Sequence, residues 1–309
     1  MATQTRRARA LDRQMDAILA AEGQERKRRW VTNRQLRRML NNRLSTLGLI
    51  VFGVIVLASL AAPLLAPYNP AQMDLTTILK PPSAEHWLGT DKIGRDVLSR
   101  ILYGGRVSIF VGLGSALGAA VIGVTLGIYA GYVGGWVDKV VFRISEMVMA
   151  FPQIVLVLLL VSIVGQSLGN LMIIFIGTGW GSMYRMARSQ TLSIREEEYI
   201  AALRAFGINK VIVCAKHILP NALGPIMVNV TLSTAMFILQ ESSLSFLGLG
   251  VPMEIPTWGN ILNVANDLTI LNNAWWMWLP VGLVISIFVL SVNFIGDGLR
   301  DSTDPSQQG

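Results

Sequence analysis

The chain has 309 residues, of which 52% are hydrophobic and only 15% are charged. A soluble domain usually carries about 25% charged residues, so this composition argues against an ordinary soluble protein. The formal net charge is +7, but the basic residues gather in blocks beside apolar segments and no nucleic-acid-reading domain is recognisable, so we expect no nucleic-acid binding.

The chain begins with a basic arm at residues 1–43, and an apolar segment follows it directly. A cluster of Arg and Lys before an apolar run holds that side of a membrane helix in the cytoplasm. We therefore expect residues 44–67 to form a first transmembrane helix. The arm and the apolar run are both too long for a secretory signal peptide, so this helix is expected to be retained.

Five further apolar segments predict membrane-spanning helices, because crossing the bilayer takes roughly 20 apolar residues. A polar segment, residues 68–105, comes first, and residues 106–300 then form the core. The spans are expected near Val107–Tyr132, Val140–Val164, Leu168–Met186, Leu219–Leu249 and Trp275–Ile295. The predicted fold class is therefore an all-α polytopic membrane protein with about six transmembrane helices.

Basic residues in alternate loops predict the orientation. They follow the second span, cluster again around residues 185–216, and recur at Arg300, whereas the loops Gly165–Asn170 and Val251–Asn273 contain neither Lys nor Arg. The positive-inside rule then places both termini in the cytoplasm, including the tail at residues 301–309, and residues 68–105 outside.

Glycines recur at helical spacing within the second span. Small residues in such a pattern let two helices approach closely. We therefore predict close helix packing, rather than a dinucleotide-binding loop, for Gly112, Gly114, Gly118, Gly123, Gly127 and Gly131.

The loop at residues 188–218 carries the strongest functional signal. Ser193 and Glu196 predict a capping box that starts a helix at about Ile194, and Gly207 predicts its left-handed end. An apolar stripe is expected along this helix at Tyr199, Ala202, Leu203 and Phe206. Asn209 is expected to cap a second short helix. The residues alone leave open whether the stripe lies on the protein's own body, on the membrane interface or in the groove of a partner.

This loop resembles the cytoplasmic coupling loop of ABC importer permeases. That pattern reads Glu-Ala-Ala, three residues, Gly, nine residues, Ile, any residue, Leu-Pro, and Gly207 and Leu219-Pro220 keep the spacing. The first triplet is replaced by Ala201-Ala202-Leu203, with acidic residues just upstream. The resemblance implies contact with an ATPase subunit for Glu198, Tyr199, Ala202, Leu203, Phe206, Gly207 and Pro220.

A second resemblance covers roughly residues 40–309. Residues 86–100, read as HWLGTDKIGRDVLSR, are similar to the external segment of the dipeptide/oligopeptide/nickel permease group, in its second-subunit branch. Ser243–Gly250, Pro256–Gly259 and Gly296–Asp301 resemble the same branch. The resemblance implies a type I ABC importer permease fold in a prokaryotic inner membrane.

The resemblance also implies a set of partners. A sister permease subunit would complete the pathway for peptides or related small solutes. Two ATPase subunits would bind ATP and Mg, and an external binding protein would deliver the substrate. The chain lacks the phosphate loop G-x-x-x-x-G-K-[ST], so we expect neither a bound cofactor nor a catalytic residue of its own.

Three polar residues in apolar surroundings are candidates for lining the pathway: Asn229, Gln240 and Glu241. A carboxylate inside a membrane costs about 2–3 kcal/mol, so Glu241 is the main candidate; a polar contact between helices is the equal alternative. Glu146 has a simpler explanation, namely an ion pair with Arg143 three residues earlier.

The external segment holds a further group of charges at Asp91, Arg95 and Asp96. These residues are candidates for contacting the binding protein, although a self-contained cap joined by salt bridges is the slightly favoured interpretation. His86 and His217 are expected on opposite membrane faces, so no metal site is predicted.

Two other classes of membrane protein are alternatives to the importer. An ion-coupled secondary transporter often has internal repeats and charged residues at mid-span, and neither is clear here. A membrane-embedded hydrolase would need paired catalytic side chains at one depth, and no such pair is recognisable. Dependence on ATP rather than on an ion gradient separates the importer from the secondary transporter.

Overall fold

The structure, a computed structural model, describes residues 42–303, and within this range it contains helices and no β-strand. Most of the basic arm and the tail beyond Thr303 lie outside the described residues. Five long helices form the body: α3 (Arg43–Leu60), α5 (Val97–Val133), α8 (Leu168–Arg195), α11 (Leu219–Phe246) and α14 (Trp275–Thr303).

Shorter elements connect and extend these helices. They are α4 (Ala62–Leu65), α6 (Gly135–Met149), α7 (Gln153–Val164), α9 (Glu198–Ala205), α10 (Lys210–Val213), the π-helix η1 (Cys214–Ile218), α12 (Trp258–Leu262), the 3₁₀-helix η2 (Asn263–Asn266) and α13 (Leu268–Asn273). Because α10, η1 and α11 follow one another without a break, they form one rod from residue 210 to residue 246.

Four helical segments of the described range are long and apolar enough to cross a membrane, and a fifth results if α6 and α7 count as one bent span. The remaining predicted span, Leu168–Met186, coincides with α8, whose second half carries Arg185, Arg188 and Arg195. All six predicted apolar segments are therefore helical, and the predicted fold class is confirmed.

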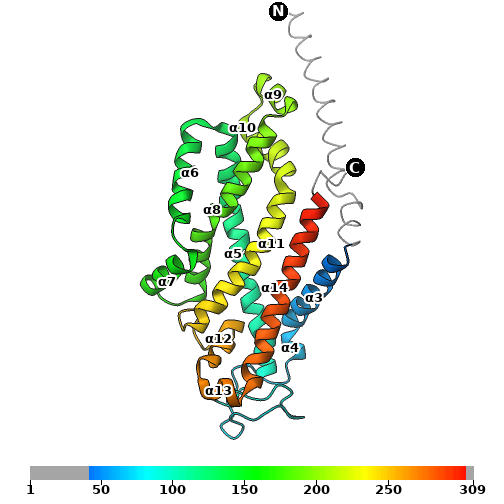
Figure 1. Ribbon diagram of the computed structural model, residues 1–309, viewed down its shortest axis with the longest axis vertical. Coiled ribbons are helices and arrows are strands. Elements are labelled where there is room, and N and C mark those ends of the chain that lie inside the picture. The colour runs from blue at the N-terminus through cyan, green and yellow to red at the C-terminus, as the bar shows by residue number, and fades with distance from the viewer. Residues whose placement is uncertain (1–41, 304–309) are drawn as a thin grey trace, which may run out of the picture.

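Figure 1 shows the helices as an elongated bundle. The central helix α5 packs against α8 and α11, while α3 packs against α14 on the other side. The helix α9 lies at one end of the bundle, and α12, α13 and the segment between α4 and α5 lie at the opposite end. Long rods therefore join the two ends.

The predicted role of the α5 glycines is confirmed. A Cβ atom on Gly123 would lie 2.4 Å from the Trp180 carbonyl oxygen, and one on Gly127 would lie 2.6 Å from the Tyr184 carbonyl oxygen. Further along α5, Gly112 faces Ile238 of α11 in the same way. Only a residue without a Cβ lets these backbones approach so closely.

The second span begins earlier than the sequence predicted. The helix α5 starts at Val97, not near Val107, because the Asp96 side chain caps it by accepting a hydrogen bond from the Ser99 amide at 2.8 Å. This is the usual N-cap arrangement. Residues 97–105 of the predicted external segment are thus helical and form the first turns of α5, and their place outside the membrane stays a prediction.

The third predicted span is not continuous, and this expectation was wrong. The helices α6 and α7 meet at an angle of 83° across residues 150–152. Pro152 explains the break, because a proline disfavours the helical conformation for the residue before it and lacks an amide hydrogen. Because the residues around Pro152 are apolar, the sequence pattern predicted one continuous span across this proline.

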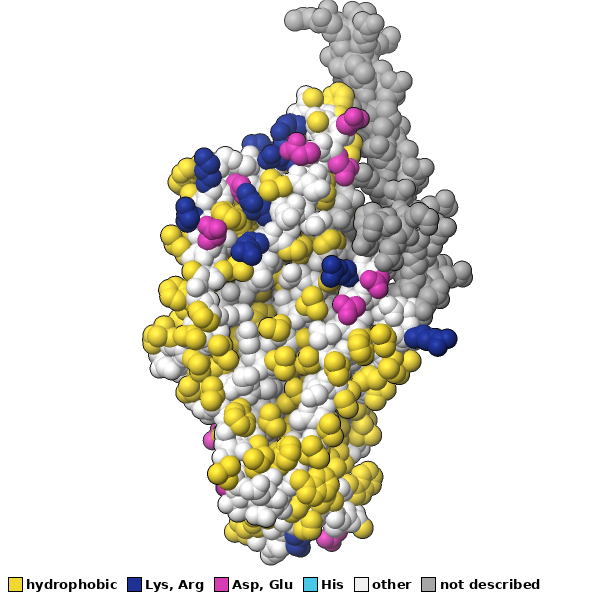
Figure 2. Space-filling model, in the orientation of Figure 1, with side chains coloured by type: hydrophobic (Ala, Val, Ile, Leu, Met, Phe, Trp, Pro, Cys, Tyr) yellow, Lys and Arg dark blue, Asp and Glu magenta, His cyan; other side chains and the backbone are white. Residues whose placement is uncertain are grey.

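The surface agrees with the distribution of charge along the chain. In Figure 2, Lys and Arg side chains gather at the end that holds α9, and hydrophobic side chains cover much of the remaining visible face. An apolar belt flanked by polar ends is the expected surface of a membrane-embedded bundle.

Candidate functional site

The helix α9 is held on the end of the bundle by one face. Ile200 and Leu203 are buried, and they belong to the same apolar cluster as Tyr132 at the end of α5 and Ile194 near the end of α8. A helix of 8 residues is too short to be stable alone. This packing therefore fixes where α9 lies.

The opposite face of α9 is exposed. Ala202 is exposed, and 61% of the Phe206 surface is accessible. The predicted single stripe is thus divided: Leu203 points inward, Tyr199 is half-buried, and Ala202 and Phe206 point away. The sequence analysis did not identify Ile200 as a buried residue that holds α9 on the bundle. Its spacing of three residues from Leu203 is the helical signal that could have identified it.

Two more exposed apolar residues, Val211 and Ile212, follow in α10. Together with Phe206 they form what we term the α9–α10 knob. Charged and amide side chains flank it: Glu198, Arg204, Asn209 and Lys210 are all exposed. A group of large exposed apolar side chains marks a surface that contacts a protein or a membrane.

The turn between α9 and α10 is fixed by backbone geometry. Gly207 has φ +72°, its amide donates to the Arg204 carbonyl, and the Ile208 amide donates to the Leu203 carbonyl. This pair of bonds is a Schellman motif, which favours glycine at that position. Asn209 caps α10 by accepting from the Val211 amide at 2.9 Å. The predictions for Gly207 and Asn209 are confirmed.

The predicted capping box is wrong. The helix α8 continues through Ser193 to Arg195, and α9 begins at Glu198 without a side-chain cap. Burial of Ile194 in the main apolar cluster explains why α8 continues over this turn. Glu196 instead lies beside Arg195, with 3.4 Å between the carboxylate and the guanidinium.

Further contacts join α9 to the helices beneath it. The Arg204 guanidinium lies over the Tyr132 ring, 5.4 Å from its centre. From the first turn of α11, the Asn221 side chain donates to the Tyr199 hydroxyl at 3.1 Å. Pro220 lies in that same first turn, as predicted. The helix α9, which carries Phe206 just after its end, is therefore connected directly to both α5 and α11.

A bidentate ion pair joins α6 to α8 close to this end. The Arg188 guanidinium donates to both carboxylate oxygens of Asp138, at 2.5 Å and 2.6 Å. The guanidinium also lies over the Phe142 ring. The sequence analysis missed this pair, because fifty residues separate its partners and neither carries a local signal. By contrast, the predicted pair of Arg143 and Glu146 is present at 3.2 Å.

Of the three pathway candidates, Glu241 lies inside the packed bundle. Its side chain is fully buried and accepts hydrogen bonds from the hydroxyls of Ser245 at 2.8 Å and Ser108 at 3.2 Å. The Ser108 hydroxyl also accepts from the Trp258 amide. Glu241 therefore joins α11 to α5 and, through Ser108, to α12, which agrees with the alternative of a contact between helices.

The other two candidates have partners nearby. The Gln240 amide group donates to Gln153 of α7 at 3.1 Å, and Asn229 accepts from Ser233 one turn later in α11. Both residues are half-buried. A role of Asn229, Gln240 or Glu241 in the pathway stays a prediction.

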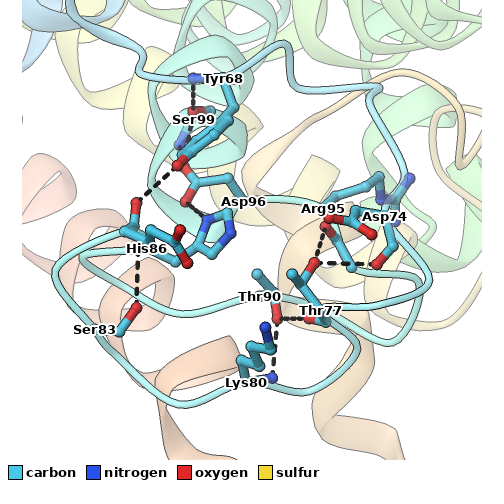
Figure 3. A network of polar contacts seen from close by, with 12 residues as sticks. Tyr68, Asp74, Thr77, Lys80, Ser83, His86, Thr90, Arg95, Asp96 and Ser99 are labelled. Atoms are coloured by element: carbon cyan, nitrogen blue, oxygen red, sulfur yellow. Dashed lines mark hydrogen bonds and ion pairs between the residues drawn. The ribbon is translucent and has the colours of Figure 1, made fainter.

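At the opposite end, the predicted external segment, which we term the cap, is held together by its own polar contacts, which Figure 3 shows. The Arg95 guanidinium donates to Asp91 at 2.7 Å, and the His86 ring contacts Asp96 at 2.9 Å. Asp91 and Asp96 are buried. This geometry agrees with a self-contained cap, and contact of Asp91, Arg95 or Asp96 with a binding protein stays a prediction.

Two acidic residues near the cap have lowered pKa values. Hydrogen bonds from the Thr76 hydroxyl and amide lower the pKa of Asp74, and a hydrogen bond from Lys92 lowers the pKa of Asp267. The second contact, at 2.9 Å between Lys92 and Asp267, ties the cap to the start of α13.

Among residues 42–303, no three His, Cys, Asp or Glu side chains are grouped in a way that could hold a metal ion.

Comparison with known proteins identifies related chains. Residues 123–308 match the family described as binding-protein-dependent transport system inner membrane component, and residues 32–82 match the N-terminal TM domain of oligopeptide transport permease C. A putative peptide permease protein of Brucella suis is 38% identical over 88% of this chain and 90% of its own length.

Two relatives come from Bacillus subtilis. Its dipeptide transport system permease protein DppC is 38% identical over 87% of this chain and 84% of its own length. Its oligopeptide transport system permease protein OppC is 36% identical over 87% of each chain. The match extends over most of the chain in each case, so it covers both the loop at residues 188–218 and the cap.

Proposed function

Because the chain belongs to the family of binding-protein-dependent transport system inner membrane components, and is thus a transmembrane permease subunit of an ABC importer, we propose that it forms half of a peptide pathway. The relatives named for peptide, dipeptide and oligopeptide transport support a peptide substrate. The same kinship disfavours an ion-coupled secondary transporter. A sister permease, two ATPase subunits and an external binding protein complete the proposed assembly.

One observation supports the site of ATPase contact above all others. The α9–α10 knob exposes Phe206, Val211 and Ile212, while the other face of α9 is buried against the bundle. An amphipathic helix that is anchored on one face and apolar on the other is suited to docking in the groove of a partner. Glu198 and Arg204 would then form the polar rim.

The proposed mechanism follows from the contacts of α9 with the helices beneath it. Closure of the ATP-bound subunits would displace α9, and its contacts with Tyr132 and Asn221 would carry that displacement into α5 and α11. Both helices run toward the opposite end of the bundle. ATP and Mg would be bound by the ATPase subunits, and this chain would contribute the moving pathway wall.

The first experiment is co-purification of the tagged chain from its native membrane. The double variant Ala202→Glu and Phe206→Glu places two charges on the exposed face and leaves the buried anchors Ile200 and Leu203 intact. We expect it to lose the ATPase subunits but to keep the sister permease, because a desolvated unpaired charge disfavours docking.

A matched control is Leu268→Glu, which changes an exposed leucine at the opposite end. It should retain the ATPase subunits. Equal loss from both variants, or ATPase binding that survives the double change, would refute the assignment of the knob as the ATPase contact.

The substrate class is tested by the uptake of labelled dipeptides and longer peptides by cells with and without the chain. Unchanged uptake of every peptide would contradict a peptide substrate.

A further inference from the structure

The end of the first span carries large apolar side chains that point away from the bundle. Leu57 and Leu60 are mostly exposed near the end of α3, and in α4 the exposed fractions are 89% for Leu64 and 55% for Leu65. The 18 residues of α3 reach only about 27 Å at 1.5 Å per residue. The bilayer core is about 30 Å thick, so α4 completes the crossing and Leu64 and Leu65 lie at its outer edge.

The external cap folds back onto this edge. Tyr68, three residues beyond α4, contacts the His86 ring with 4.7 Å between ring centres, and its hydroxyl donates to the Glu85 carbonyl. Figure 3 shows Tyr68 and His86 against each other. Residues 85 and 86 therefore lie beside the chain where it leaves the membrane.

The next residue, Trp87, is one of the most exposed large side chains of the cap, with 70% of its surface accessible. Its neighbours in sequence are fixed, since His86 is bonded to Asp96 and a Cβ on Gly89 would lie 2.6 Å from the Trp276 ring. The exposure of Trp87 is thus a property of an ordered segment.

A second tryptophan independently indicates how deep residues 86–90 lie relative to the membrane. Trp276 lies in the first turn of α14, and its indole nitrogen donates to the Thr90 carbonyl at 3.3 Å. Tryptophans are enriched at the level of the lipid headgroups, where the ring is apolar and its N–H finds polar partners. Both ends of residues 86–90 are therefore joined to parts of the chain at the outer membrane edge.

We propose that Trp87, Leu64 and Leu65 form a lipid contact that anchors the external cap in the headgroup region of the outer leaflet. Leu64 and Leu65 follow the exposed Leu57 and Leu60 at the end of α3, a helix long and apolar enough to cross a membrane. A binding protein would need to cover these exposed apolar side chains at the level where the chain leaves the bilayer, whereas lipid covers them without a further partner. The anchor holds the cap at a fixed height over the pathway.

The test is fluorescence quenching of a thiol-linked dye in the intact complex, reconstituted in lipid vesicles. Single cysteines are introduced as Trp87→Cys and, because Leu64 is almost fully exposed and tolerates replacement, as Leu64→Cys. Cys214 is buried, so the unaltered chain supplies the labelling blank. Leu57→Cys in α3 serves as the lipid reference and Gln72→Cys, an exposed polar position of the cap, as the water reference.

We expect lipids with a nitroxide near the headgroup to quench the dye at residues 87 and 64 several-fold more than at residue 72. Iodide in the water should quench residue 72 most. Iodide quenching at residue 87 equal to that at residue 72 would overturn the anchor. So would protection of residue 87 that occurs only after the binding protein is added, because the surface would then belong to that protein.

Discussion

At the scale of single residues, Glu241 is the buried group whose replacement discriminates best between roles. Glu241→Ala leaves a cavity and removes the acceptor of Ser245 and Ser108. Such a change costs about 2–4 kcal/mol. Glu241→Gln keeps the shape and an acceptor oxygen, so we expect a clearly smaller loss. Thermal unfolding of the purified complex measures both.

Ser243→Ala, in the same helix but exposed, is the control and should leave the unfolding midpoint unchanged. If Gln and Ala destabilise equally at position 241, the negative charge itself is required. If neither destabilises, the contact between helices contributes nothing.

The ion pair of Asp138 and Arg188 gives a second prediction at this scale. Arg188→Lys should lose most of the interaction, because an ammonium cannot form the two parallel bonds of a guanidinium. A double-mutant cycle with Asp138→Asn and Arg188→Gln should give a coupling energy of about 2 kcal/mol. A coupling near zero would mean that α6 and α8 are held by apolar packing alone.

Single residues also show which features could be predicted from the sequence alone. Gly207 and Asn209 were predictable because a left-handed turn and a helix cap depend on the residue itself and its immediate neighbours. The pair of Arg143 and Glu146 lies within one helical turn. Asp138 and Arg188 were not predictable as partners, since only the packing of α6 on α8 brings them together.

At the scale of helices, the packing of α5 on α8 makes a sharp prediction. Gly123→Ala places a methyl group 2.4 Å from a backbone oxygen of α8, so the two helices must separate. We expect a loss of about 1–3 kcal/mol, as for other overpacked interiors. The measurement is the thermal unfolding midpoint of the complex.

Gly177→Ala is the matched control, because Gly177 lies within α8 and a Cβ there meets no atom within 4 Å. It should be neutral or stabilise by up to about 1 kcal/mol, since alanine favours a helix more than glycine does. Equal effects of the two changes would show that the glycines act through helix propensity and not through packing.

Helix positions were predicted well and their ends less well, for physical reasons. Apolar length identified all six segments, because the bilayer imposes it. Pro152 broke the third segment despite that apolar length. In the loop at residues 188–218, Ser193 and Glu196 matched a local capping pattern, but burial of Ile194 kept α8 continuous. Tertiary packing outweighs a capping preference of about 1 kcal/mol.

For the whole molecule, the two ends of the bundle were predicted from charge, whereas the identity of the helices that pack against each other was not. Basic loops separate the α9 end from the cap end, and Figure 2 shows Lys and Arg gathered at the former. Which helices lie side by side depends on glycine faces and buried polar groups such as Glu241. The sequence shows that such glycines and polar residues are present, but not which helix packs against them.

The same charge pattern predicts how the bundle is oriented in the cell. We expect the α9 end to face the cytoplasm, because basic loops are retained on that side. Single cysteines at Ala202 and Gln72, which are exposed at the α9 end and in the cap, can be labelled with a membrane-impermeant maleimide. In spheroplasts, Gln72→Cys should react and Ala202→Cys should not. In inside-out vesicles stripped of the ATPase subunits, which would otherwise cover residue 202, the reactivities should be exchanged. Labelling of Ala202→Cys from outside would place the α9–α10 knob out of reach of ATP and contradict the coupling role.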